Sequence, residues 1–173
     1  MFSRWEYPSP LGVLTLSECG GALCGLWLPG QKHFAADNPE ILSAPMEDSP
    51  VFRETVRWLD AYFSHAAPDS SALPLDPASE FSKPPSPFRR AVWKRLRTIP
   101  YGETVTYGKL AQMISDETGI RTSARAVGNA VGHNPISIII PCHRVTGAGG
   151  MLTGYAGGIE AKMFLLELER FDR

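Results

Sequence analysis

Apolar and polar residues alternate in short runs between residues 5 and 28, and this alternation predicts β-strands. The runs Val13–Leu16 and Ala22–Leu28 lie on either side of Glu18–Gly21, whose two glycines are typical of a tight turn. This part of the chain therefore predicts a β-hairpin.

The spacing of apolar residues then changes to that of a helix. Within residues 51–64, four apolar side chains recur at intervals of four, three and four residues, which gives one helical face: Phe52, Val56, Leu59 and Phe63. Beyond it, residues 66–87 hold six of the chain's fifteen prolines among Ser, Ala and Asp. Such a composition is typical of a long surface connection, so we expect two domains, residues 1–82 and residues 83–173.

The second part of the chain predicts mainly helices. Ser86 can accept a hydrogen bond from a free backbone N–H and Pro87 suits a first helical position, so a helix begins there and ends at Ile99-Pro100. The run Ile136–Ile140, four isoleucines with one serine, predicts a short buried strand. The last helix covers about residues 159–170 and is expected to place these residues on one side: Ile159, Met163, Leu166 and Arg170.

Two further helices lie between these elements. Thr106 is a candidate cap of the first, and a turn through Gly119 ends it. Thr122 or Ser123 can cap the second, which extends from residue 124 to about residue 132. Two short helices joined in this way resemble a helix-turn-helix in outline.

Composition narrows the class of protein. The 173 residues are 43% hydrophobic and 20% charged, which is typical of a soluble globular protein, and no apolar stretch approaches the roughly 20 residues that cross a bilayer. The N-terminus has no signal-peptide layout, and three cysteines are too few for a disulfide framework. We therefore expect a cytoplasmic protein with free thiols.

The net charge of −1 conceals an asymmetry. Residues 1–82 carry four Lys and Arg against eleven Asp and Glu, whereas residues 83–173 carry thirteen against seven, so the halves have formal charges of −7 and +6. A basic second half indicates an anionic partner. Charge alone leaves open that these residues only keep the protein in solution.

The candidate chemistry lies in Pro141–Val145, directly after the predicted strand. Cys142 has three interpretations: a buried structural thiol, a metal ligand or a nucleophile. No Cys or His partner at metal-ligand spacing lies nearby. His143 and Arg144 can both stabilise a thiolate, which favours the nucleophile, although the residues alone leave the structural thiol open.

Six glycines follow between residues 147 and 158, which either let the backbone approach a flat ligand or form flexible turns. The run Ile140–Val145 resembles the active-site motif of the O6-alkylguanine-DNA alkyltransferases. The resemblance covers residues 86–173, about half of the chain, and looks most like the bacterial stand-alone form. It continues, in the family's order, through Phe88–Trp93, Ile99–Gly102, Val105–Ala111, Ala124–Gly128, Asn134–Pro135, Gly154–Gly158 and Lys162–Glu169.

The resemblance implies an α/β (α+β) fold. A small N-terminal domain of a sheet and a helix supports a mainly helical C-terminal domain, which carries a helix-turn-helix and the loop of the active-site cysteine. The implied function is DNA repair by irreversible, stoichiometric transfer of the alkyl group from O6-alkylguanine to Cys142, by a methylated-DNA–protein-cysteine methyltransferase that reacts once per molecule. Activity on O4-alkylthymine stays open.

The resemblance also implies roles in the reaction. Cys142 is the nucleophile, His143 is a base that acts through a water, and Glu169 orients His143. Tyr107 donates a hydrogen bond to the base. Glu167 lies close enough in sequence to compete with Glu169 for this position, but the count from Lys162 favours Glu169.

Further positions match the family's substrate and DNA contacts. The backbones at Cys142, Val145 and Ala156 match contacts to the flipped-out base, Asn134 matches a hinge and Lys162 a pocket lysine, although a solvent-facing lysine is an alternative. Tyr155 lies in the same matched block. For DNA binding through the minor groove and base flipping, the implied residues on or before the second helix of the pair, besides Tyr107, are Ser123, Arg125, Ala126 and Gly128.

The implied partner is double-stranded DNA that carries O6-alkylguanine, with no membrane, no cofactor and a monomeric protein. Pro85-Ser86 replaces the Gly-Thr frequent in the family, and the connection before it is lengthened. Some eukaryotic members bind zinc in the N-terminal half. Here the spacing of the candidate ligands does not match, so we expect no zinc at Cys19, Cys24, His33 and His65.

Three other functions compete. A non-catalytic binder of alkylated DNA would lack the nucleophilic cysteine, which is present. A Cys-His-Glu hydrolase would turn over repeatedly on an ester or peptide. A helix-turn-helix regulator would bind a specific duplex sequence and leaves the thiol beside His143 without a role.

Overall fold

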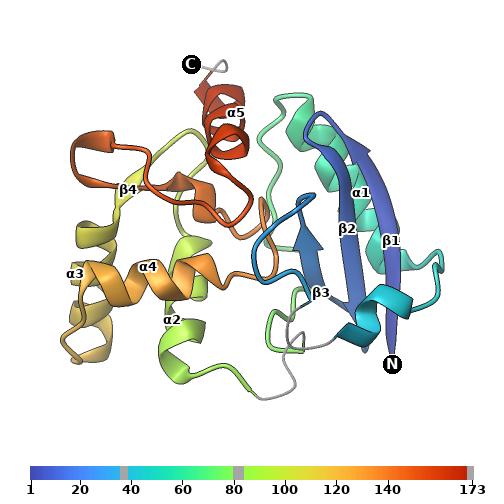
Figure 1. The fold of residues 1–173 in the computed structure, drawn as a ribbon, viewed down its shortest axis with the longest axis horizontal. Helices are drawn as coiled ribbons and strands as arrows, with labels where there is room; N and C mark the ends of the chain where they lie inside the picture. Colours follow the sequence, from blue (N-terminus) through green and yellow to red (C-terminus); the bar gives the residue numbers. More distant parts are fainter. Residues whose placement is uncertain (36–38, 80–83, 171–173) are drawn as a thin grey trace. The chain divides into compact units, whose positions relative to one another are not determined.

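The structure is a computed structural model, which describes residues 1–35, 39–79 and 84–170 (Figure 1). The chain forms two compact units. Unit 1 comprises residues 1–84 together with 135–137, and unit 2 comprises residues 85–134 and 138–173. The mixed α/β class expected from the sequence is confirmed.

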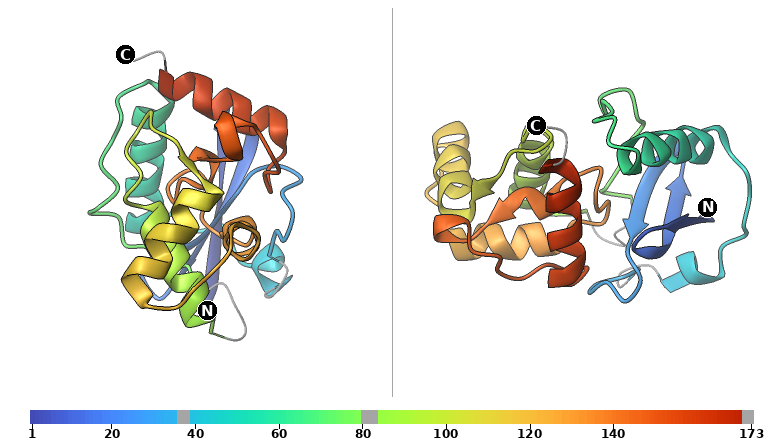
Figure 2. Two further views of the ribbon diagram at one scale, coloured as in Figure 1. Left: turned by 90° about the vertical axis from the view of Figure 1, so that its left-hand side faces the viewer. Right: turned by 90° about the horizontal axis from the view of Figure 1, so that it is seen from above.

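Unit 1 is a three-stranded antiparallel sheet with one helix on a face. The strands β1 (Phe2–Ser9), β2 (Gly12–Cys19) and β3 (Ala22–Trp27) lie in chain order, so the predicted hairpin is β2–β3, and β1 adds a strand that the sequence pattern did not separate. The helix α1 (Pro50–Phe63) runs along one face (Figures 1 and 2). A short 3₁₀ turn, Pro39–Ser43, precedes it.

Aromatic side chains hold α1 on the sheet. Trp5 stacks on Phe52 with ring centroids 6.4 Å apart, and Tyr7 stacks on Phe63 at 6.2 Å. The Tyr7 hydroxyl also donates to Asp60 Oδ1 at 2.8 Å. Aromatic pairs bury large apolar areas, so these contacts fix the helix against β1.

The outer edge of β3 is covered by two short segments. At Leu23, backbone hydrogen bonds join Pro74 and Asp76, which belong to the proline-rich connection. At Leu26, the bonds join Pro135 and Ser137. An exposed strand edge is a site for unwanted pairing, and these segments close it.

Unit 2 contains four helices among its described residues: α2 (Pro87–Leu96), α3 (Tyr107–Thr118), α4 (Ala124–Gly132) and α5 (Ile159–Arg170). Their starts confirm the predicted caps, because each of three hydroxyls accepts a hydrogen bond from a backbone N–H in the first turn: Ser86 from Arg89, Thr106 from Lys109 and Ser123 from Ala126. Gly119 ends α3 in the left-handed conformation, with φ of 69°.

The short elements of unit 2 carry the reactive segment. The two-residue strands β4 (Val105–Thr106) and β5 (Val145–Thr146) pair in parallel. A 3₁₀ turn, Cys142–Arg144, comes directly before β5, and a second, Ala148–Gly150, follows it. The start of α3 and the end of the cysteine turn therefore lie side by side.

One sequence prediction is wrong. The run Ile136–Ile140 is buried but forms no strand: Ile136 makes a single bridge, and the chain then turns at Ile138, whose φ is 70°. A mostly apolar run indicates burial, which a buried turn satisfies as well as a strand does. On α5, Ile159 and Met163 are exposed, and the buried side includes Lys162 and Glu169, because these polar groups find partners inside.

Candidate active site

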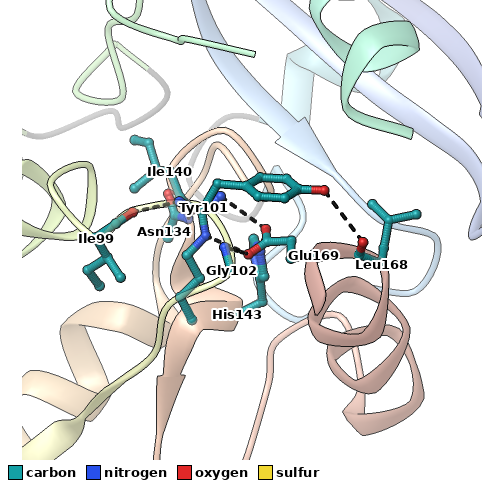
Figure 3. A network of polar contacts seen from close by, with 9 residues as sticks. Ile99, Tyr101, Gly102, Asn134, Ile140, His143, Leu168 and Glu169 are labelled. Carbon is teal, nitrogen blue, oxygen red and sulfur yellow. Dashed lines mark hydrogen bonds and ion pairs between the residues drawn. The ribbon is translucent and has the colours of Figure 1, made fainter. Parts of the chain in front are cut away.

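Cys142 begins the 3₁₀ turn and is buried, with 3% of its surface exposed. Asn134, just after the end of α4, donates from its Nδ2 to the Ile140 carbonyl oxygen at 2.8 Å (Figure 3). The same Nδ2 lies 3.2 Å from Cys142 Sγ, its second acceptor. A structural thiol normally lies among aliphatic side chains, whereas this sulfur accepts a hydrogen bond from a buried amide.

Burial raises the pKa of the Cys142 thiol, so the resting group is protonated. Three neighbours act in the opposite direction and favour the thiolate: Asn134, Tyr155 and Lys162. The sequence pointed instead to His143 and Arg144. The structure directs the Arg144 guanidinium away to Glu169, so the expected effect of Arg144 on the thiol is wrong.

Glu169, on the last turn of α5, lies at the centre of a buried polar network (Figure 3). Its Oε1 lies 2.6 Å from His143 Nε2, and its two oxygens accept from Arg144 Nε at 2.9 Å and Nη2 at 3.0 Å. The backbone N–H of Gly102 donates to Oε2 at 3.0 Å. Glu167 is exposed, so of the two glutamates it is Glu169 that contacts His143.

The ionisation states follow from these contacts. Burial raises the pKa of Glu169, but the hydrogen bonds and charges of His143 and Arg144 outweigh it and hold the pKa at about 2. Burial lowers the pKa of His143, so the ring is neutral at pH 7. Because a carboxylate only accepts, His143 Nε2 carries the proton and Nδ1 carries the lone pair.

The turn before β4 is fixed to the same network. Arg144 Nη1 donates to the Ile99 carbonyl oxygen at 2.6 Å, and the guanidinium lies 5.7 Å from the centre of the Tyr101 ring. The Tyr101 hydroxyl donates to the Leu168 carbonyl oxygen at 3.5 Å. The sequence did not predict that Arg144 and Gly102 donate hydrogen bonds to Glu169. Both residues lie in the matched motif blocks, but the spacing of these blocks along the chain does not indicate which residues bind each other.

Lys162 is fully buried, which excludes the solvent-facing alternative. Its Nζ donates to the carbonyl oxygens of Val145 at 2.6 Å and Thr153 at 3.1 Å, with Gly154 at 3.5 Å. Val145 comes just before the glycine-rich loop of residues 147–158, and Thr153 and Gly154 lie further along it. Lys162 therefore links two parts of this loop through its hydrogen bonds. A carbonyl oxygen has two lone pairs, so the Val145 oxygen keeps one for a further donor.

Tyr107, the first residue of α3, is half-buried beside this site. Its ring centre lies 5.8 Å from Lys162 Nζ. Burial and the nearby Cys142 raise the pKa of its hydroxyl, which therefore stays protonated and can donate. Gly128 on α4 lies against the ring, since a Cβ there would contact two ring carbons at 3.7 Å.

The predicted DNA-binding residues lie at the start of α4. Ser123, Arg125 and Ala126 are exposed. The Ser123 hydroxyl caps the helix, so its acceptor is already engaged with Ala126. Of the remaining predicted residues, Tyr155 and Ala156 are half-buried in the turn that precedes α5.

The four residues considered as zinc ligands differ from one another in exposure. Cys24 is buried with its Sγ donating to Ser17, Cys19 is half-buried, and His33 and His65 are exposed. In the described parts of the chain, no three His, Cys, Asp or Glu side chains are grouped so as to hold a metal ion. No described helix is long and apolar enough to cross a membrane.

Comparison with known proteins covers both units. The model of the 6-O-methylguanine DNA methyltransferase DNA-binding domain matches residues 87–171, and that of the ribonuclease-like domain of the same family matches residues 6–77. The methylated-DNA–protein-cysteine methyltransferase of Haemophilus influenzae is 40% identical over 95% of this chain and 84% of its own length. The protein of that name from Methanosarcina acetivorans is 40% identical over 94% of this chain and 95% of its own.

Solved structures agree. The crystal structure of the Mycobacterium tuberculosis O6-methylguanine methyltransferase has a TM-score of 0.79 and 42% identity, covering 100% of this chain and 95% of that one. A crystal structure of Mycobacterium tuberculosis OGT in complex with DNA has a TM-score of 0.76 and 41% identity, covering 98% of this chain and 92% of that one.

Proposed function

Because this chain belongs to the 6-O-methylguanine DNA methyltransferase family, we propose that it binds DNA and repairs it by transferring the alkyl group of O6-alkylguanine to Cys142. The observation that carries this proposal is the buried thiol of Cys142, which accepts a hydrogen bond from Asn134 and adjoins a neutral histidine fixed by Glu169. This is the arrangement of a nucleophile, a base and an orienting acid.

In the proposed reaction, His143 Nδ1 takes the Cys142 proton through a water, and the sulfur attacks the alkyl carbon. The bond from that carbon to guanine O6 breaks, and its electron pair stays on the oxygen. Tyr107, protonated and beside the site, donates to the base and offsets the negative charge that develops there. The guanine anion then takes up one proton at N1 from water, and His143 releases to water the proton that it took from Cys142. The products are a thioether at Cys142, neutral guanine and a neutral His143.

Burial of the thiol suits a protein that reacts once. A protonated thiol is a weak nucleophile, so Cys142 resists stray electrophiles until a base removes its proton. A thioether has no acidic proton and its sulfur is a poor leaving group, so the alkyl group stays. Each molecule is thereby consumed.

The guanine O6 lies inside the duplex, so we propose that the base is flipped out to reach Cys142. Arg125 is exposed on α4, and we assign it to fill the space that the flipped base leaves between its neighbours in the duplex. The small residues Ala126 and Gly128 allow α4 to approach the minor groove closely. The formal charge of +6 on residues 83–173 favours DNA phosphates as the partner.

The remaining expectations are also proposals. We assign Val145 and Ala156 backbone contacts to the flipped base, and Tyr155 and Lys162 to the walls of its pocket. We expect a cytoplasmic monomer that needs no cofactor. None of the three cysteines, all of which lie among the described residues, forms a disulfide, in keeping with a reducing compartment.

A titration of the protein with an excess of duplex that carries one O6-methylguanine tests the proposal. We expect demethylated duplex to plateau at one per protein molecule, and Cys142→Ser to bind the same duplex without reaction. The alternative, a non-catalytic binder, predicts binding with no demethylation by the unsubstituted protein. Continued turnover on esters or peptides would instead identify a hydrolase.

A further inference from the structure

Three residues of the reactive segment belong to unit 1. Pro135–Ser137 lie in sequence between Asn134 and Cys142, yet they are part of the sheet of the N-terminal unit. Leu26 N donates to the Pro135 carbonyl oxygen at 2.8 Å, and Ser137 N donates to the Leu26 carbonyl oxygen at 2.9 Å. The segment thus extends the sheet by one short parallel bridge at the edge of β3.

A side-chain hydrogen bond adds to these two backbone bonds. Gln31 Oε1 accepts from Ser137 Oγ at 2.9 Å and from the backbone N–H of Leu28 at 3.1 Å. Gln31 and Ser137 are both buried and are 106 positions apart in sequence. Loss of either partner would leave a buried polar group unsatisfied, which is costly.

The residue after this anchored segment is strained. Ile138 is fully buried and has φ of 70°, a left-handed conformation that is an outlier for a β-branched residue. Such a conformation persists only where the surroundings fix it from both sides. Ser137 is held on β3 on one side, and Asn134 holds Ile140 and Cys142 on the other.

We propose that Gln31 and Ser137 are positioning residues for alkyl transfer: their hydrogen bond holds residues 135–137 on β3 and so fixes the turn that presents Cys142 Sγ to the Asn134 amide. The alkyl-transfer readout of this proposal rests on the proposed function. The positioning role would make the reactivity of Cys142, which belongs to unit 2, depend on two residues of unit 1.

The proposal predicts a change in thiol reactivity and not only in stability. Without the side-chain bond, two backbone hydrogen bonds hold the segment, and the turn at Ile138 can relax. The Asn134 amide then stabilises the Cys142 thiolate less well, which raises the pKa of the thiol. The pH profile of Cys142 alkylation therefore moves to higher pH.

The test compares Gln31→Leu, Ser137→Ala and the double variant with Ser17→Ala as matched control. Ser17 is a buried serine of unit 1 whose hydroxyl donates to the Ser3 carbonyl oxygen and accepts from Cys24 Sγ. Two rates are measured: methyl transfer from the O6-methylguanine duplex, and alkylation of Cys142 by iodoacetamide across pH, located by peptide mass. Unfolding midpoints are recorded for every variant.

We expect Ser137→Ala to slow both reactions about tenfold, the size of one buried hydrogen bond, and Gln31→Leu to slow them at least as much, because it also leaves the Leu28 N–H without its acceptor. The double variant should be no slower than the slower single variant, because the bond between Gln31 and Ser137 is lost in all three. Ser17→Ala should react as the unsubstituted protein does, even if its midpoint falls equally. Unsubstituted rates in Ser137→Ala, additive effects in the double variant, or equal slowing by Ser17→Ala would overturn the proposal.

The iodoacetamide rates separate this proposal from the proposed function, because that reagent requires no DNA. A protein that takes no methyl group from the duplex refutes the proposed function. An unshifted pH profile in Ser137→Ala refutes the positioning role, whatever the outcome with DNA.

Discussion

His143 Nε2 lies 2.6 Å from Glu169 Oε1, although 26 positions separate the two residues and both are buried. The carboxylate fixes the imidazole tautomer and thereby leaves Nδ1 as the basic nitrogen. Arg144 and the Gly102 N–H hold the same carboxylate from other directions. The His143 imidazole is therefore oriented by a hydrogen-bond network centred on Glu169.

His143→Gln removes the base while keeping a polar side chain. We expect methyl transfer at pH 7 to fall by about 10²–10⁴-fold, the usual contribution of a general base. Because burial lowers the pKa of His143, the unsubstituted protein should keep its rate as pH falls through 6.5. The variant should instead gain rate with rising pH, as the Cys142 thiol ionises above its ordinary value. Single-turnover rates between pH 5 and 10 check this; parallel profiles would contradict a role as base.

Glu169→Gln should cost about 3–5 kcal/mol of unfolding free energy, because it leaves the buried Arg144 charge without its partner. The folded-state pKa of Glu169, about 2, is below its ordinary 4.5, so its contribution is present above pH 4.5 and is lost as pH falls towards 2. That loss is on the order of 3 kcal/mol. Denaturant unfolding from pH 2 to pH 6 should show this slope in the unsubstituted protein and in Glu167→Gln, the exposed control, but not in Glu169→Gln.

Asn134→Asp replaces the amide that donates to Cys142 Sγ with an acceptor of the same shape. A hydrogen bond to a charged group contributes about 1.5–3 kcal/mol, so the rate of thiolate reactions at Cys142 should fall by about 10- to 100-fold at pH 8. Iodoacetamide alkylation measures this directly. Asn129→Asp, on the exposed side of α4, is the control and should have no effect. Equal rates in Asn134→Asp, Asn129→Asp and the unsubstituted protein would show that Asn134 does not stabilise the Cys142 thiolate.

Arg125→Ala should slow repair of the duplex by about tenfold, since flipping a base costs a few kcal/mol, and should leave reaction with free O6-methylguanine unchanged. Parallel assays on the duplex and the free base distinguish these effects. Lys94→Ala, an exposed charge on α2, controls for the loss of one positive charge. Equal losses on both substrates would refute a flipping role.

The sequence was sufficient for the local structure of unit 2. The starts of α2, α3 and α4 were predicted from Ser86, Thr106 and Ser123, because a capping hydroxyl acts within one turn of the helix. The end of α3 at Gly119 follows from backbone chemistry that is equally local, whereas α2 ends at Leu96, before the predicted end at Ile99-Pro100. Such signals need no knowledge of the tertiary fold.

The contacts between distant positions could not be read in this way. The alternation of residues 5–28 gave strands but not the pairing of β1 with β2, nor the use of Pro135–Ser137 as an added segment of the sheet. The family resemblance predicted that Cys142, His143 and Glu169 act together, and the structure places Glu169 in contact with His143. The resemblance did not predict that the guanidinium of Arg144 also binds Glu169. Its direction depends on where α5 packs, which spacing along the chain does not encode.

Peptide mass mapping of the protein, after reaction with a duplex that carries one O6-methylguanine, tests the central claim most directly. The account predicts a gain of one methyl group in the peptide that contains Cys142, none in the peptides of Cys19 and Cys24, and no further gain with more duplex. A methyl group on another residue, or an unchanged mass while the duplex stays bound, would contradict it.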